Sequence, residues 1–238
     1  MVSCVSHNGH VRRFLTFGSA FVVLVTLLLA GDVLPVFDPP QAEPRAADRA
    51  RAEPLRVAVV GDSLSAGRSL FLGNGLDDES WMTYAEGDGI EFVGGWARSG
   101  ALPGQMASAV QPIAGVDVLV ILAGTNAVRT GKTMAEEATY YDQIASTIRP
   151  GAVLVSAIPP YRTHEPAALA YNTALRAFTE DHGWMWADPW RGARDGDDWV
   201  EGFSVDGMHP AGPEQYAVLG ESFRRIILQI RPMLSARG

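Results

Sequence analysis

The fold of this chain is decided by residues 55–67, which read LRVAVVGDSLSAG. The first part, Leu55–Val60, is a short, mostly apolar run that is rich in valine. Such a run is typical of a strand in a parallel sheet that helices cover on both faces. A turn of Gly61, Asp62 and Ser63 follows, and in an open parallel sheet chemistry collects beyond the carboxyl ends of the strands. Ser63 therefore stands where a nucleophile would be placed.

A single serine is not a site. Its hydroxyl needs a base to take the proton and hydrogen-bond donors to receive the oxyanion that forms. The structural alternative is that Ser63 caps a helix beginning near Ser65, because serine is a favoured N-cap residue. The catalytic interpretation therefore depends on partners supplied by the rest of the chain.

Strands and helices alternate after this stretch. We expect further strands at residues 91–93, 116–123, 152–158 and 184–188, and helices at residues 134–148, 166–181 and 213–230. Alternation of this kind predicts the α/β class, with a central parallel sheet between two helix layers in a three-layer α/β/α arrangement. The predicted domain spans residues 55–238.

The first 54 residues follow a different pattern. Arg12 and Arg13 precede an uncharged apolar run from Phe14 to Ala30, which predicts one N-terminal hydrophobic helix. We interpret this part of the chain as a short cytoplasmic segment (1–13), a transmembrane anchor or signal segment (14–30) and a Pro/Ala-rich tether (31–54).

The paired arginines are expected to stay inside, which places the domain outside the cytoplasm. The end of the apolar run is a poor cleavage site, so a single-pass anchor in the cell membrane is favoured over a cleaved signal. Secretion after cleavage is the alternative.

Composition narrows the possible partners. The net charge is −8 over 238 residues, which argues against nucleic acid, because phosphate binding needs clustered lysine and arginine. Cys4 is the single cysteine and permits no internal disulfide. No cofactor and no metal site is predicted.

Four tryptophans lie close together in the sequence: Trp184, Trp186, Trp190 and Trp199. We expect them to pack in the core, and aromatic platforms for sugars are the alternative.

Three blocks with polar groups follow the ends of expected strands, and a fourth lies just ahead of the last expected helix. They are Ser63 in GDSLS, Gly100 in WARSGA, Asn126 in GTN, and the pair Asp206 and His209 in DGMHP. Taken together and in this order, the four blocks resemble those of the SGNH (GDSL) hydrolase family. The resemblance covers about residues 57–230 and implies a flavodoxin-like SGNH hydrolase fold.

The resemblance implies a role for each residue. Ser63 would be the nucleophile, His209 the general base and Asp206 the acceptor that orients the histidine ring. The oxyanion hole would consist of the backbone N–H groups of Ser63 and Gly100 and the side-chain amide of Asn126.

The sequence departs from the family pattern in two blocks. Ala127 follows Asn126, where the family often has aspartate, so a local contact of that aspartate is lost. The second block lacks its usual asparagine upstream of the glycine. We choose Gly100 as the oxyanion donor because of its spacing, with Gly104 as the alternative.

Three classes of function remain open at this point. The first is an esterase, lipase or deacetylase that cleaves a small-molecule, lipid or glycan acyl ester. The second is an acyltransferase that transfers an O-acetyl group to or from a cell-envelope glycan. The third is a non-catalytic binding module, which the combination of Ser63, Asp206 and His209 disfavours. The oligomeric state is not predicted.

Overall fold

The computed structural model of this chain describes residues 53–236. The predicted cytoplasmic segment, the apolar run at 14–30 and nearly all of the tether lie outside the described residues. Within residues 53–236, no helix combines the length and the apolar character needed to cross a membrane.

Five parallel strands form the central sheet, in the order β2-β1-β3-β4-β5. Their bounds are Leu55–Gly61 (β1), Ile90–Ala97 (β2), Val118–Leu122 (β3), Ala152–Ser156 (β4) and Met185–Ala187 (β5). This is the strand order of flavodoxin-like doubly wound sheets. The predicted α/β class and parallel sheet are confirmed.

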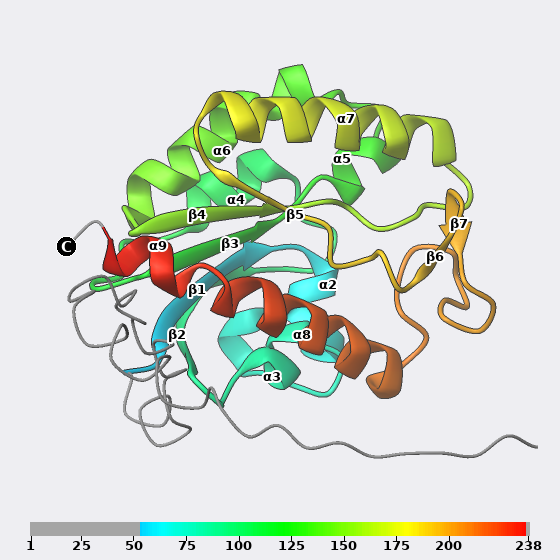
Figure 1. The fold of residues 1–238 in the computed structure, drawn as a ribbon. Coiled ribbons are helices and arrows are strands. Elements are labelled where there is room, and N and C mark those ends of the chain that lie inside the picture. Colours follow the sequence, from blue (N-terminus) through cyan, green and yellow to red (C-terminus); the bar gives the residue numbers. More distant parts are fainter. Residues whose placement is uncertain (1–52, 237–238) are drawn as a thin grey trace, which may run out of the picture. The chain divides into compact units, whose positions relative to one another are not determined.

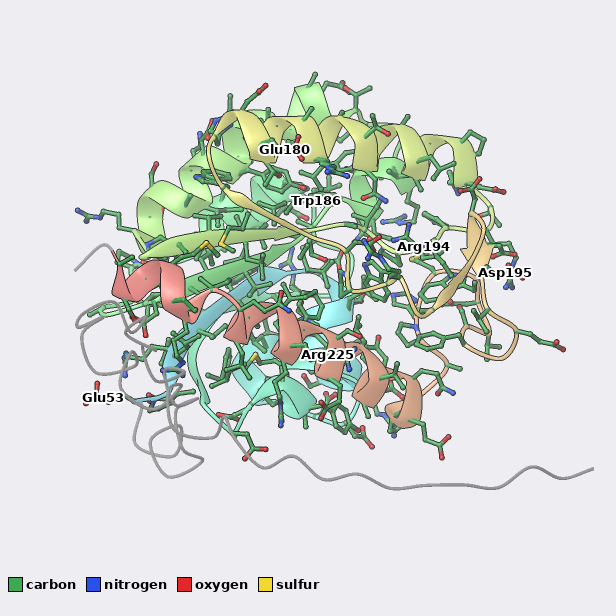
Figure 2. All side chains as sticks on the ribbon, viewed as in Figure 1. Glu53, Glu180, Trp186, Arg194, Asp195 and Arg225 are labelled. Carbon is green, nitrogen blue, oxygen red and sulfur yellow. The ribbon has the colours of Figure 1, made fainter. Side chains whose placement is uncertain are left out.

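Helices cover both faces of the sheet (Figure 1). One layer holds α4 (Pro103–Ala109), α5 (Thr125–Arg129), α6 (Met134–Ile148) and α7 (Glu165–Asp181). The other holds α2 (Ser63–Ala66), α3 (Trp81–Ala85), α8 (Pro213–Leu228) and α9 (Arg231–Ser235). Glu180 on α7 and Arg225 on α8 mark the two sides in Figure 2, where side chains fill the space between sheet and helices.

Strand β1 has buried side chains on both faces, which explains its nearly continuous apolar run. Val57 and Val59 pack in the core under α3 and α8. Ala58 and Val60 pack in the core under α4, α6 and α7. Successive side chains of a strand point to opposite faces, so a strand covered on both faces is apolar at its covered positions; Arg56, near the start of β1, is only half-buried.

Several boundaries differ from the sequence-based expectation. Helix α6 has the predicted bounds, whereas β2 extends well beyond the predicted 91–93. Gly94 and Gly95 resemble a break in the strand, but they continue it next to a bulge, where the pairing with β1 shifts between Val57 and Ala58. Short helices such as α3 and α5, of five residues each, are too short to show a helical period.

Gly95 is required by the close approach of β2 to β1. Its φ is 145°, and a Cβ atom at this position would overlap the carbonyl oxygen of Val59. We therefore expect Gly95→Ala to lower the free energy of unfolding by about 2–4 kcal/mol. Gly192→Ala is the matched control, because a Cβ atom there meets no other atom within 4 Å. Urea unfolding measures both, and equal midpoints for the two variants would contradict the packing argument.

Candidate active site

Ser63 lies directly after the carboxyl end of β1. The turn is capped by Asp62, whose carboxylate accepts a hydrogen bond from Leu64 N–H at 3.2 Å. Ser63 is therefore the first residue of α2 and not its cap, which corrects the structural alternative. Ser65 is buried and its hydroxyl accepts a hydrogen bond from Trp81 Nε1 at 2.9 Å, so Ser63 is the serine of this turn that remains partly exposed.

His209 and Asp206 complete a chain of hydrogen bonds that starts at Ser63. The distance from Ser63 Oγ to His209 Nε2 is 2.8 Å. On the other side of the ring, His209 Nδ1 lies 2.7 Å from Asp206 Oδ2. A carboxylate facing Nδ1 favours the tautomer with the proton on Nδ1. Nε2 is then free to accept the proton of the serine hydroxyl.

Asp206 is held by several donors besides the histidine ring. The backbone N–H groups of Met208 and His209 both donate to its Oδ1, each at 2.8 Å. Burial raises the pKa of Asp206, but the hydrogen bonds from His209 and from the two backbone N–H groups outweigh burial, and the pKa lies below its usual value. Asp206 therefore stays ionised at neutral pH and can orient the ring.

The loop that carries Asp206 and His209 is closed at its base. Ser204 pairs with Pro210, and Ala211 N–H donates to the carbonyl of Phe203 at 2.9 Å. Phe203 stacks on Trp199, with ring centroids 5.7 Å apart. The loop thus starts from an aromatic cluster rather than from a free chain end.

Tryptophans fix this cluster to the sheet. Trp199 meets Trp190 edge to face at 5.7 Å, and Trp190 Nε1 donates to the carbonyl of Ala157 at 2.7 Å. Trp190 and Trp199 are buried, as expected, whereas Trp184 and Trp186 are half-buried and pack against the edge of the core. Arg194 and Asp195 mark the neighbouring hairpin of β6 (Arg194–Asp195) and β7 (Asp198–Trp199) in Figure 2.

The three predicted oxyanion donors are linked through their neighbours. Asn126 Nδ2 donates to Asp62 Oδ2 at 3.4 Å and to the carbonyl of Ala101 at 3.3 Å. Asp62 precedes Ser63, and Ala101 follows Gly100. Asn126 therefore joins the ends of β1, β2 and β3 in one place. Within the described part of the chain, neither Ser63 N–H nor Gly100 N–H donates to a protein acceptor.

The backbone at Gly100 differs clearly from that at Gly104. Gly100 has a φ of 75°, and no atom lies within 4 Å of the position that a Cβ would take. Gly104 lies on α4, where a Cβ would meet the ring of Tyr140 at 3.1 Å. The open N–H of Gly100 and its link to Asn126 through Ala101 favour Gly100 over Gly104.

Asp62 is a fully buried carboxyl group at the centre of this arrangement. Burial raises its pKa to about 6, although the hydrogen bond from Leu64 N–H, the nearby His209 and the amide of Asn126 all act to lower it. An acid with this pKa is mostly ionised at neutral pH, so its Oδ2 acts as an acceptor for Asn126.

Ser63, His209 and Asp206 line one cavity of about 340 Å³. Further lining residues were not predicted from the sequence: Gly67, Arg68, Leu70, Glu79, Ser99, Pro210 and Tyr216. Arg68 and Glu79 form an ion pair at 2.8 Å on this wall. Two larger cavities, of about 460 and 470 Å³, are lined by other parts of the molecule and contain neither Ser63 nor His209.

Most of these lining residues carry no sequence signal, because an arginine or a leucine in a turn is common on any surface. Leu70 is the exception in the structure, since its φ is 62° and its side chain is 60% exposed. A bulky residue with positive φ is uncommon.

Within residues 53–236, no group of three or more His, Cys, Asp or Glu side chains could hold a metal ion.

Comparisons with known proteins agree with this geometry. The model of the GDSL-like lipase/acylhydrolase family matches residues 59–213, which is more than half of the chain. No curated protein matches the sequence.

Solved structures share the fold at low identity. One is a member of the lipolytic protein G-D-S-L family from Veillonella parvula (15% identity, TM-score 0.55), covering 72% of this chain and 97% of that one. Another is Est24, a carbohydrate acetylesterase from Sinorhizobium meliloti (18%, 0.52), covering 74% and 99%. A third is a carbohydrate esterase family 3 protein from Talaromyces cellulolyticus (17%, 0.55), covering 74% and 97%. With its sheet order, its Ser63 turn and the matching family model, this chain belongs to the GDSL-like lipase/acylhydrolase family of ester-cleaving enzymes.

Proposed function

We propose that this enzyme is a serine esterase that removes a short acyl group, of about the size of acetyl, from an alcohol. One observation carries the proposal. Ser63 Oγ lies 2.8 Å from His209 Nε2, and His209 Nδ1 lies 2.7 Å from Asp206 Oδ2, at the wall of a single cavity. These contacts support Ser63 as nucleophile, His209 as general base and Asp206 as the group that orients the ring.

The proposed reaction has two balanced halves. Ser63 Oγ bonds to the acyl carbon as its proton passes to His209 Nε2, and the carbonyl electron pair moves to oxygen. The intermediate then collapses, the bond to the alcohol breaks, and His209 returns the proton to the leaving oxygen. A water molecule repeats the sequence on the acyl-enzyme, which releases the carboxylic acid and restores Ser63.

The oxyanion of each intermediate needs donors that are already in place. We assign this role to the N–H groups of Ser63 and Gly100 and to the Asn126 amide. Support comes from the free backbone N–H groups and from the position of Asn126 between Asp62 and Ala101. Removing one such donor typically costs about 2.7–4 kcal/mol of transition-state stabilisation.

The cavity argues for a short acyl group on a polar alcohol. Its volume of about 340 Å³ is at the small end for ligand sites, and Arg68 and Glu79 place charges on its wall. A long acyl chain needs an apolar channel to bury its methylene groups. Two structures of the same fold are carbohydrate esterases, which makes an acetylated saccharide a suitable substrate class to test.

We also propose that the domain acts outside the cytoplasm, anchored by residues 14–30. The support is the sequence alone: Arg12 and Arg13 precede an uncharged apolar run with a poor cleavage site.

The first test of the reaction is labelling with a fluorophosphonate, which reacts with an activated serine. Wild-type protein should be labelled on Ser63, and Ser63→Ala should abolish labelling while the circular dichroism spectrum stays unchanged. His209→Ala should also lose labelling, because the base is gone. Ser222→Ala, which changes a half-buried serine on α8, is the control and should label normally. Labelling that persists in Ser63→Ala would exclude Ser63 as the nucleophile.

The second test concerns acyl length. On p-nitrophenyl esters, we expect kcat/KM to be highest for acetate and to fall at least about tenfold by octanoate, because the cavity offers no long apolar channel. Steady-state kinetics over the series measures this. A value of kcat/KM that rises with acyl chain length would contradict the short-acyl assignment and favour a lipase instead.

The third test concerns location. Cell fractionation should place the full-length protein in the membrane fraction, and protease added to intact cells should digest the domain. A shortened soluble product in the medium would instead show that the segment is a cleaved signal.

A further inference from the structure

The side-chain amide of Asn126 is held at both ends. Arg129 Nε–H donates to Asn126 Oδ1 at 3.2 Å. At the other end, Asn126 Nδ2 donates to Asp62 Oδ2 and to the carbonyl of Ala101, at 3.4 and 3.3 Å. Asn126 itself is only 4% exposed. Every contact therefore matches one orientation of the amide, in which the oxygen faces a donor and the nitrogen faces two acceptors.

From these contacts we propose that Arg129 is a positioning residue, which holds the Asn126 amide with Nδ2 on the side of Asp62 and Ala101, where it can donate to the oxyanion. The inference rests on the proposed function, because it matters only if Asn126 stabilises the oxyanion. Arg129 is thereby added to the site. No sequence block contains Arg129, and its exposed position on α5 does not by itself indicate a role.

The flipped orientation of Asn126 shows why a positioning residue is needed. Rotation of the amide by half a turn would place Oδ1 beside the Asp62 carboxylate and the Ala101 carbonyl, so that acceptors would face one another. The same rotation would present an acceptor, and not a donor, to the oxyanion. Arg129 disfavours this state further, since a guanidinium offers only donors and would be left facing the amide nitrogen.

Arg129 also strengthens the donor. A cation bonded to the oxygen of an amide draws electron density toward that end, which polarises the N–H bonds at the other end. The two acceptors that Nδ2 contacts now are 3.3 and 3.4 Å away, longer than ordinary N–H···O bonds. Such weak bonds are easily exchanged for one to a developing oxyanion.

Local geometry makes Arg129 the residue of α5 that can do this. Residues three apart share a face of a helix, which brings Arg129 over Asn126. Ala127, directly after Asn126, is buried and has no polar side-chain atom. Thr125 Oγ1 is buried and has no hydrogen-bond partner within the described residues. Arg129 therefore supplies the side-chain donor to the amide oxygen.

The test is a double-mutant cycle on kcat with a p-nitrophenyl ester. Arg129→Ala should lower kcat about tenfold with little change in KM, because the donor matters most once the oxyanion forms. Arg129→Lys should recover part of the loss, since it keeps the charge without the fork of donors. In the Asn126→Ala background, Arg129→Ala should cause no further loss.

A stability role is separated by thermal unfolding. One partly buried hydrogen bond between residues three apart contributes little to folding, so Arg129→Ala should unfold close to the wild-type temperature. Arg176→Ala removes an exposed arginine that is paired with Glu180 on α7, and it is the control with unchanged kcat.

Three outcomes would overturn the inference. One is a normal kcat in Arg129→Ala. Another is an equal loss from Arg129→Ala with and without Asn126, which would mean that Arg129 acts elsewhere. The third is a normal kcat in Asn126→Ala. In each of these cases, loss of activity in Ser63→Ala would leave the proposed esterase function standing.

Discussion

The position of β1 between β2 and β3 is the constraint on which the rest of the structure depends. The chain leaves β1 to form β2 on one side and then crosses back to form β3 on the other. The two connections diverge at the carboxyl end of β1, and such a switch point leaves a crevice there. Ser63 stands at this end, with the loop after β2 on one side and the Asn126 turn after β3 on the other. The position of β1 in the strand order is thus what places the serine at the crevice.

A buried carboxylate ties these strand ends together. Asp62 is buried away from water, and this loss of solvation of the charged form raises its pKa to about 6. Three neighbouring groups partly offset the loss of solvation and act to lower the pKa: Leu64 N–H, the nearby His209 and the Asn126 amide. Two carboxyl groups interact with His209 in different ways. Asp206 is hydrogen-bonded to the ring, and Asp62 acts through space from the interior.

The opposite wall of the site is organised by packing rather than by charge. The loop of Asp206 and His209 rises from Phe203, which stacks on Trp199, which in turn meets Trp190. The hydrogen bond from Trp190 to Ala157, just beyond β4, connects this aromatic cluster to the sheet. The position of His209, within hydrogen-bond distance of Ser63, therefore depends on the packing of tryptophans that lie about 10 to 20 residues earlier in the chain.

Sequence by itself determined the class of fold, the family and the candidate residues of the site. The apolar run of β1, the bounds of helix α6 and the four polar blocks could be predicted from the sequence, because periodicity and turn residues are local properties. Ser63 is far in sequence from the neighbouring pair Asp206 and His209, yet the order of the four blocks and their resemblance to the family pattern were enough to group them. The bulge of β2 between Phe92 and Gly94, the orientation of the Asn126 amide and the contact from Arg129 were decided only by the tertiary structure. Each depends on which atom of a distant segment lies within about 3 Å, and such distances follow from packing that no local pattern of residues encodes.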